Sequence, residues 1–423
     1  MGKRKHLIIG CGSAAISAAE EIRRLNSGDE VTLVSMEQCD PYSPLSLPYV
    51  LGRRIKESDI RLRDAKSLRR IGATIIRGRK AVRVDTGAGE VIYDSGERDR
   101  YDRLLIATGS EPLIPSLEGL EEIGFQGFHV MEDLEEITRK LQDGKEVLIY
   151  GGGLVALGLA MGLMERGCEV KIVVRSRILR GYFDEECGAL ITRIFEERGC
   201  QIFSGCAIKT LRRSDGQVEA VLDKGPAIRT DFPIMCVGVR PRTAFLEGSG
   251  IMVRKGVVVN KRMQTNIENV YAAGDVAESP DFLTGVSGLS PILPSAVEQG
   301  RIAGANIAGG ELEYEGWIPM NSFNFFGHRA VTIGMFDAEG EKIEVLTERD
   351  EAKKQFKKLV IEEGRLIGGS FLNIPLSAGI IRYLIREKVD VGGSQKLFLE
   401  KPNEVSAWLM LRAEKRQAMP LGM

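Results

Sequence analysis

Two glycine-rich segments have the residue types and spacing of pyrophosphate-binding turns: Gly10-x-Gly12-x-x-Ala15 and Gly151-x-Gly153-x-x-Ala156. In each, the first glycine permits a tight turn and the second lets the backbone approach a pyrophosphate closely. The alanine allows a helix to pack tightly on a strand, and the helix N-terminus offers unpaired N–H groups and a positive dipole end. One such motif could be a structural glycine turn. Two in one chain predict two dinucleotides bound side by side, with electron transfer between them.

The elements that position these motifs alternate between short apolar strands and helices. Strands are expected before the motifs, at Leu7–Ile9 and Glu146–Tyr150, and helices after them, at Ser17–Leu25 and Leu154–Arg166. Further expected elements are strands at Glu30–Ser35, Tyr101–Thr108, Glu169–Val174, Pro233–Val237 and Val270–Gly274, and a helix at Pro294–Ile307. The pattern predicts an α/β fold with two Rossmann-like dinucleotide-binding domains, the second inserted in the first. Beyond Gly310 the chain turns strand-rich and aromatic and then helical, which predicts an α+β C-terminal domain.

Composition excludes several classes of protein. The 423 residues carry 58 basic and 59 acidic side chains, a net charge of −1, so the chain is neither histone-like nor an acidic tail. Apolar residues make up 43%, as in globular proteins. The seven cysteines form no CxxC pair, and none of the three histidines lies near a cysteine cluster. We therefore expect reduced thiols, a cytoplasmic location and no metal site.

Two uncharged stretches resemble membrane signals, at Leu7–Ala19 and Val147–Met164. Both contain a glycine cluster between a β-branched run and an alanine- or leucine-rich run. That order is typical of strand, turn and helix rather than of a continuous spanning helix, so we expect no membrane span.

The two motifs, together with YDRLLIATGSEP at 101–112 and NVYAAGDVAE at 269–278, resemble the FAD- and NAD(P)-dependent pyridine nucleotide–disulfide oxidoreductase superfamily. The resemblance spans essentially the whole chain. It implies an FAD-binding domain at 1–115 and 246–315, an NAD(P)-binding domain at 116–245, and a C-terminal interface domain at 316–423. It also implies FAD and NAD(P)H as cofactors, with hydride passing between nicotinamide C4 and flavin N5. Direct hydride transfer needs no general base, so no catalytic acid or base is assigned.

The resemblance assigns cofactor contacts residue by residue. The strand end at Ala107 would close over FAD, Asp275 would bind its ribityl–phosphate region, and the helix after Pro294 would stabilise the anionic reduced flavin. Glu37 is the candidate ribose ligand, although it lies two residues later than expected. The expected FAD contacts are Gly10, Gly12, Ser13, Ala14, Ala15, Glu37, Ser43, Pro44, Leu45, Ala107, Thr108, Gly109, Gly274, Asp275, Pro294 and Ser295. The expected nicotinamide-dinucleotide contacts are Gly151, Gly153, Leu154, Val155, Arg175, Arg177 and Gly238.

The loop from Asp40 to Tyr49 departs from two branches of the family that it resembles. In NADH oxidases and coenzyme A–disulfide reductases a redox cysteine precedes the Gly-Leu-Pro-Tyr run, but here that position holds Leu45, and Cys39 lies outside it. Leucine cannot supply a thiolate, so disulfide reduction and sulfenate-based oxidase chemistry are rejected.

The same loop, Pro44-Leu45-Ser46, also resembles the Pro-Leu-Ser-Lys loop of oxygenase-type ferredoxin reductases. The lysine position holds Leu47, and the position of its glutamate partner holds Gly158. Losing both charges leaves no stranded buried ion. This register predicts a roomier, less polar nicotinamide pocket.

Nicotinamide choice follows from the residues after the strand at Glu169–Val174. No acid stands at its end, and Arg175 and Arg177, with Arg180 beyond, could clamp a 2′-phosphate, which favours NADPH. The alternative is that these arginines are solvated surface charges. NAD(P)H is therefore the expectation.

Residues 53–83 carry twelve Arg or Lys and three acids. This basic stretch could steer an acidic redox partner such as an iron–sulfur protein, or it could be a solvated face balanced elsewhere. It has no aromatic interleaving, which argues against nucleic acid. We expect an FAD oxidoreductase with an iron–sulfur partner, similar to the flavoprotein subunits that connect phenylglyoxylate dehydrogenase-type complexes to NAD. The alternatives are a stand-alone NAD(P)H oxidase or quinone reductase, and a flavin-retaining scaffold. The C-terminal domain would form a homodimer or dock other subunits.

Overall fold

The computed structural model describes residues 3–26, 28–141 and 144–417. The chain divides into two compact units, one of Met1–Arg175 with Gly205–Trp317 and the other of Ser176–Ser204 with Ile318–Met423. The three domain boundaries expected from the sequence cut the chain differently and stay a prediction. Each unit is described by itself.

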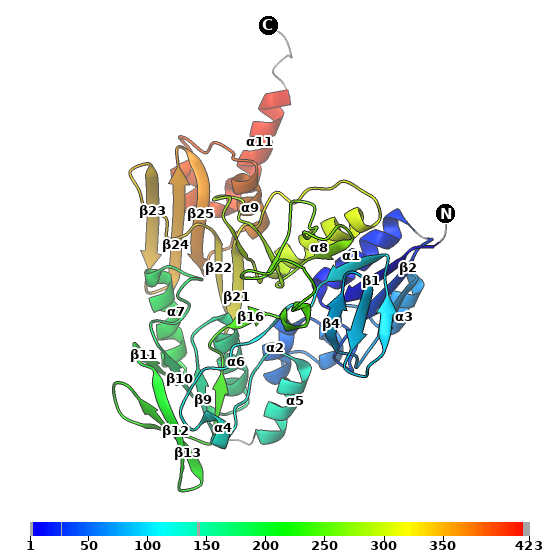
Figure 1. The fold of residues 1–423 in the computed structure, drawn as a ribbon. Coiled ribbons are helices and arrows are strands. Elements are labelled where there is room, and N and C mark those ends of the chain that lie inside the picture. The colour runs from blue at the N-terminus through cyan, green and yellow to red at the C-terminus, as the bar shows by residue number, and fades with distance from the viewer. Residues whose placement is uncertain (1–2, 27, 142–143, 418–423) are drawn as a thin grey trace. The chain divides into compact units, whose positions relative to one another are not determined.

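The first unit contains a five-stranded parallel sheet in the order β18-β7-β1-β2-β3, of which β1 and β2 are labelled in Figure 1. Its strands are β1 (Lys5–Ile9), β2 (Glu30–Val34), β3 (Ala73–Ile76), β7 (Arg103–Ile106) and β18 (Val270–Ala272). The central strands are apolar on both faces because helices and loops cover both. This is the doubly wound arrangement that the sequence predicts, and it brings the carboxyl ends of β1, β7 and β18 to one edge.

Helices α1 (Ser13–Leu25) and α8 (Leu293–Ile307) pack against each other on this sheet. A Cβ on Gly300 would lie 2.2 Å from the carbonyl oxygen of Ala14, and one on Gly304 would lie 2.5 Å from that of Ala18. Only glycine therefore permits this spacing. Helix α1 begins at Ser13, four residues before the expected Ser17, because it starts directly at the glycine turn.

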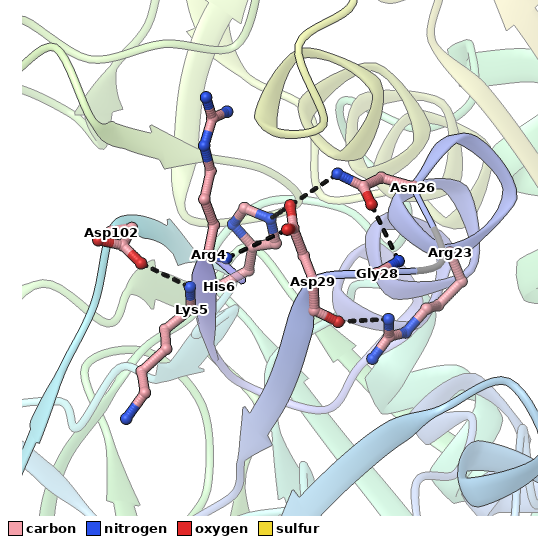
Figure 2. A network of polar contacts seen from close by, with 8 residues as sticks. All are labelled: Arg4, Lys5, His6, Arg23, Asn26, Gly28, Asp29 and Asp102. Carbon is pink, nitrogen blue, oxygen red and sulfur yellow. Dashed lines mark hydrogen bonds and ion pairs between the residues drawn. The ribbon is translucent and has the colours of Figure 1, made fainter. Parts of the chain in front are cut away.

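A polar network at the amino end of β1 links that strand to the segment between α1 and β2 (Figure 2). His6 Nε2 lies 2.8 Å from Asp29 Oδ2, and both side chains are buried. The backbone N–H of Arg4 and the amide of Asn26 also donate to the Asp29 carboxylate, while Arg23 donates to the Asp29 carbonyl. The network lies at the amino end of the strand, away from Gly10, so we assign it a structural role.

A second sheet contributes three parallel strands to this unit, in the order β10-β9-β15. Its strands are β9 (Glu146–Tyr150), β10 (Glu169–Val174) and β15 (Phe232–Met235), with helix α6 (Leu154–Glu165) following β9. From Ala156 to Leu163 helix α6 is buried without interruption, which explains why the sequence imitates a membrane span. No helix among the described residues is long and apolar enough to cross a membrane.

Smaller elements complete the first unit. Its remaining strands are β4 (Ala81–Asp85), β5 (Glu90–Tyr93), β6 (Arg98–Arg100), β8 (Ser110–Pro112), β12 (Ile208–Ser214), β13 (Gln217–Leu222), β14 (Ile228–Thr230), β16 (Val239–Pro241), β17 (Val257–Val258), β19 (Ala277–Pro280) and β20 (Ser287–Leu289). Its remaining helices are η1 (Pro44–Ser46), α2 (Leu47–Leu51), η2 (Glu57–Ile60), α3 (Ala65–Arg70), α4 (Leu120–Ile123), α5 (Met131–Lys140) and η3 (Ala244–Leu246). The antiparallel pair β8–β16 joins the connections between the two parallel sheets.

The second unit is built on a five-stranded antiparallel sheet in the order β21-β22-β25-β24-β23. Its strands are β21 (Met320–Phe325), β22 (His328–Gly334), β23 (Ile343–Asp350), β24 (Gln355–Glu362) and β25 (Arg365–Leu372), with β11 (Gln201–Ser204) elsewhere in the unit. Its helices are α7 (Glu185–Glu197), α9 (Ala378–Arg386), α10 (Gln395–Glu400), η4 (Pro402–Glu404) and α11 (Val405–Gln417). Phe195 of α7 stacks with Phe325 at a centroid distance of 5.5 Å, so the aromatic run of β21 is core.

Candidate functional site

The first glycine motif forms a cradle that side chains would fill. Gly10 has φ +118°, and a Cβ there would lie 2.1 Å from the carbonyl oxygen of Ala107 at the end of β7. Gly12 is the N-cap of α1, no side chain caps the helix, and a Cβ on Gly12 would meet no atom within 4 Å. Gly274, with φ +84°, leaves just enough room for Ala14. The residues fit a bound pyrophosphate.

The second motif repeats this geometry. Gly151 has φ +133°, and a Cβ there would lie 2.0 Å from the carbonyl oxygen of Cys236, just beyond β15. Gly153 is the N-cap of α6, again without a side-chain cap, and Ala156 is fully buried. Leu154 and the exposed Val155 form the first turn of α6. In each cradle the first glycine of the motif packs against a backbone carbonyl group from a distant part of the chain. The sequence alone does not identify that carbonyl group.

Glu37 lies beyond the end of β2, where a ribose ligand is expected. Its Oε2 accepts a hydrogen bond of 2.8 Å from the Tyr42 hydroxyl, which itself accepts one from the backbone N–H of Met131. The strand-end position holds the buried Ser35, whose hydroxyl accepts from the Glu37 N–H. Burial raises the pKa of Tyr42, so its hydroxyl stays a donor. Oε1 of Glu37 has no hydrogen-bond partner among the described residues and can accept from a ribose hydroxyl.

Asp275 follows β18 and receives a hydrogen bond of 3.0 Å from the Ser110 hydroxyl. Burial raises its pKa, and the Ser110 hydrogen bond opposes that rise. The imidazole Nε2 of His129 lies 2.9 Å from the Ser110 carbonyl oxygen. Ser110 and His129 were not expected as part of the site, because they are far from Asp275 in sequence.

The N-terminus of α8 contains Pro294 in its first turn and no side-chain cap. Ser295 is buried and its hydroxyl lies 2.9 Å from that of Ser290. One turn further, the buried Gln299 accepts a hydrogen bond from the Gly274 N–H and donates one to Ser279. Gln299 thus fixes the glycine before Asp275, and sequence reasoning missed it because a helical glutamine carries no motif.

The ends of β7 and β15 lead into the β8–β16 pair. Thr108 donates to the Arg242 carbonyl oxygen at 2.9 Å, and Gly109 has φ +63° with nothing near its missing Cβ. Gly238 has φ +124°, and the nearest side chain to its missing Cβ is Leu113. These glycines let the chain turn where two strand ends and two connections meet.

The loop that replaces the redox cysteine presents an apolar side chain. Ser43 precedes η1, Pro44 is the first residue of η1, and Leu45 is 59% exposed. Leu47, at the expected lysine position, is 1% exposed, so the register places leucine in the core. Pro48 fills the space beside Gly158, because a Cβ there would lie 3.0 Å from the proline Cγ. Pro48 thus occupies part of the space beside Gly158, and the roomier nicotinamide pocket stays a prediction.

The two arginines after β10 differ in their contacts. Arg175 is exposed and makes no hydrogen bond or ion pair within the described part of the chain. The Arg177 guanidinium donates to the Phe183 carbonyl oxygen at 2.8 Å and more weakly to that of Ile178. Arg175 is thus the better candidate for a phosphate ligand, and the two-arginine clamp stays a prediction.

About half of the basic stretch at 53–83 is neutralised, largely by acids outside it. Arg54 pairs with Glu165, Arg63 with Glu20, Arg77 with Asp40, Arg79 with Glu97, and Arg83 with Asp85. Arg53, Lys56, Lys66, Arg70 and Lys80 are exposed and have no ion pair within the described residues. These five side chains keep part of the stretch's positive charge at the surface.

The cysteines near the motifs are poor nucleophiles. Burial raises the pKa of Cys11 to about 12, that of Cys39 to about 11 and that of Cys236 to about 12. A thiolate is the reactive form of cysteine, so none of these is activated for disulfide exchange.

Comparison with known families gives two matches. The model described as pyridine nucleotide-disulphide oxidoreductase matches residues 4–308, and the rubredoxin NAD+ reductase C-terminal domain matches residues 319–388. Among curated relatives, the epsilon subunit of NADH-dependent phenylglyoxylate dehydrogenase from Aromatoleum evansii is 31% identical over 96% of this chain and 97% of its own length. An NADH oxidase from Methanocaldococcus jannaschii is 33% identical over 73% of this chain and 71% of its own.

Solved structures share the fold at low identity. The covalent putidaredoxin reductase–putidaredoxin complex matches with a TM-score of 0.86 and 20% identity, covering 96% of this chain and 99% of that one. A water-forming NADH oxidase from Lactobacillus brevis bound to NADH matches at 0.86 and 20%, covering 98% and 100%. Its engineered NADPH-oxidase variant, bound to NADPH, matches at 0.85 and 21%, covering 97% and 99%.

Proposed function

Since this chain belongs to the pyridine nucleotide-disulfide oxidoreductase family, whose members are FAD-containing NAD(P)H oxidoreductases, we propose that it passes electrons between NAD(P)H and an iron–sulfur protein through FAD. The observation that carries this proposal is the pair of glycine cradles. In both, an uncapped helix N-terminus follows a glycine that packs against a backbone carbonyl, and both cradles lie in one compact unit.

When bound, FAD supplies a ring that takes a hydride from the nicotinamide and releases electrons to an acceptor. The residues of this chain bind the two cofactors and orient them. The α1 N-terminus and Gly10 receive the FAD pyrophosphate, Glu37 Oε1 accepts from its ribose, and Asp275 receives its ribityl–phosphate region. The first turn of α8 presents N–H groups and a positive dipole end toward the flavin. The α6 N-terminus holds the nicotinamide dinucleotide.

A disulfide is not the proposed acceptor. Leu45 stands where the redox cysteine would stand, and burial raises the pKa of the cysteines nearest the motifs. Two likenesses support an iron–sulfur partner: the rubredoxin-reductase type of the C-terminal domain, and the fold shared with putidaredoxin reductase. The exposed cations of the basic stretch, such as Lys66 and Arg70, suit an acidic protein surface. By analogy with the phenylglyoxylate dehydrogenase subunit, the partner is a subunit of the same complex.

We further propose that NADPH binds more tightly than NADH. In the engineered oxidase, the first substitution introduces an alanine. Three later substitutions, at consecutive positions, introduce an alanine, an arginine and a serine. Here Ala156 is followed, at the same separation, by Val174, Arg175 and Ser176. A fifth substitution there introduces an arginine where this chain has Gly181. The phenylglyoxylate dehydrogenase relative is NADH-dependent, so both nucleotides are compared experimentally.

Stopped-flow mixing of the FAD-reconstituted protein with NADPH and NADH tests the proposal. We expect bleaching of the flavin absorbance at a rate that saturates with NADPH, and reduction of an added acidic [2Fe–2S] ferredoxin or rubredoxin. A protein that stays colourless after FAD treatment, or a flavin that NAD(P)H does not reduce, would refute the function. Rapid oxygen consumption without an added partner would instead favour the oxidase alternative, which the NADH oxidase relative supports.

A further inference from the structure

The short helix α2, which follows the exposed Leu45, lies directly against the nicotinamide helix α6. Glycines on both sides form the contact. A Cβ on Gly162 would lie 2.7 Å from the Pro48 carbonyl oxygen, and one on Gly158 would lie 3.0 Å from the Pro48 Cγ. A Cβ on Gly52, just after α2, would lie 3.3 Å from the Gly162 Cα. At Gly162 the two backbones therefore approach closely, whereas at Gly158 the Pro48 ring fills the contact.

Polar contacts join α6 to the segment around α2 at the C-terminal end of α6. The Arg54 Nε donates to Glu165 Oε1 at 2.8 Å, and Arg166 donates to the Leu51 carbonyl oxygen. Gly158, Gly162 and Glu165 are spaced along one face of α6, since residues three and four apart are neighbours on a helix. The contact thus fixes α2 along more than one turn of α6.

We propose that Gly158 and Gly162 are positioning residues: by letting Pro48 seat on α6, they set the distance between the Leu45 loop and the nicotinamide site. This inference rests on the proposed function, in which Leu45 occupies the position of the family's redox cysteine. The chain has neither partner of the lysine–glutamate ion pair that could link these segments, since Leu47 and Gly158 occupy those positions. The packing of Pro48 against Gly158 and Gly162 therefore links the two segments in place of an ion pair.

A contact of this kind matters because hydride transfer depends steeply on geometry. Reacting atoms must approach to about 3–3.5 Å, and a misplacement of about 1 Å can cost about a hundredfold in rate. The dinucleotide is proposed to bind at the first turn of α6, whereas Pro48 contacts the helix further along, at Gly158 and Gly162. A shift of α2 would therefore lower the hydride-transfer rate and leave the affinity for NAD(P)H nearly unchanged.

The test compares flavin reduction by NADPH in stopped flow, separating the limiting rate from the apparent Kd. In Gly162→Ala, the new Cβ meets a backbone carbonyl that cannot rotate away, and we expect the limiting rate to fall at least about tenfold. In Gly158→Ala the new Cβ meets only the proline ring, and we expect a fall of about threefold. Alanine favours a helix over glycine, so both variants should fold.

A double-mutant cycle with Pro48→Ala makes the test specific. Removing the proline Cγ relieves the clash with a Cβ at Gly158 but not the clash at Gly162, which involves the Pro48 carbonyl. Pro48→Ala should therefore rescue Gly158→Ala and fail to rescue Gly162→Ala. Gly379→Ala, on α9, is the control and should leave the rate unchanged, because its Cβ would meet only the Ser377 hydroxyl oxygen, at 3.9 Å.

The outcomes separate the two proposals. A wild-type flavin that NAD(P)H cannot reduce defeats the proposed function and this inference with it. A wild-type flavin that is reduced, with Gly162→Ala equally fast, defeats the positioning role alone. A change in Kd with an unchanged limiting rate, or a shifted flavin potential that accounts for the rate, also defeats it.

Discussion

Replacing Arg175 by alanine should weaken NADPH binding and leave NADH binding unchanged. Arg175 is exposed and has no hydrogen bond or ion pair within the described residues, so its guanidinium is available to a 2′-phosphate without breaking another contact. The substitution should for the same reason cost little stability.

The magnitude follows from the chemistry of the contact. A hydrogen bond to a charged group contributes about 1.5–3 kcal/mol. Its loss should raise the Kd for NADPH about 10- to 150-fold at low salt, because a factor of ten corresponds to about 1.4 kcal/mol. Arg175→Glu should weaken NADPH further, since it places a carboxylate beside the phosphate, and its carboxylate could accept from the ribose hydroxyls of NADH.

The assay is the apparent Kd from flavin reduction at increasing NADPH and NADH. Arg177→Ala is the informative comparison, because the Arg177 guanidinium donates to backbone carbonyl oxygens. This variant should lower the melting temperature and leave the ratio of the NADPH and NADH Kd values nearly unchanged. Arg139→Ala, an exposed arginine on α5, is the control. An unchanged NADPH Kd in Arg175→Ala would refute the assignment, and so would an equal loss for NADH.

Three further predictions concern the first cradle, the cysteines and the buried histidine. Gly10→Ala should lose FAD on gel filtration, because its Cβ would lie 2.1 Å from a carbonyl; Gly96→Ala, also at positive φ but with open space, should retain it, and equal retention by both would contradict the cradle. Iodoacetamide at pH 7 should leave the rate of flavin reduction unchanged, since burial raises the pKa values of Cys11 and Cys39 to about 12 and 11; inactivation that tracks labelling of either would argue for a thiol role. Burial lowers the pKa of His6 in the folded protein. The contribution of neutral His6 to stability is therefore complete above the pKa of the unfolded chain, about 6.5, and is lost as the pH falls through the pKa of the folded protein. The melting temperature of the wild type should therefore fall more steeply below that pH than that of His6→Gln, and parallel curves would count against it.

Much of the fold was predictable because strand, glycine turn and helix follow one another locally. The spacing of Gly10, Gly12 and Ala15 specifies a turn that a backbone can make without help from distant residues. The start of α1 was misplaced by four residues, since the expectation followed the apolar pattern and the helix instead begins at the glycine turn. The strand at Tyr101–Thr108 proved shorter, at Arg103–Ile106.

The sequence by itself determined the two motifs, the parallel sheets they require and the absence of a thiol at Leu45, because each depends on residue type and local spacing. Only the tertiary structure decided which groups complete the site: the carbonyls of Ala107 and Cys236, the Gln299 amide and the Pro48 seat beside Gly158. These contacts join residues far apart in the chain, and their distances follow from packing that no local pattern encodes.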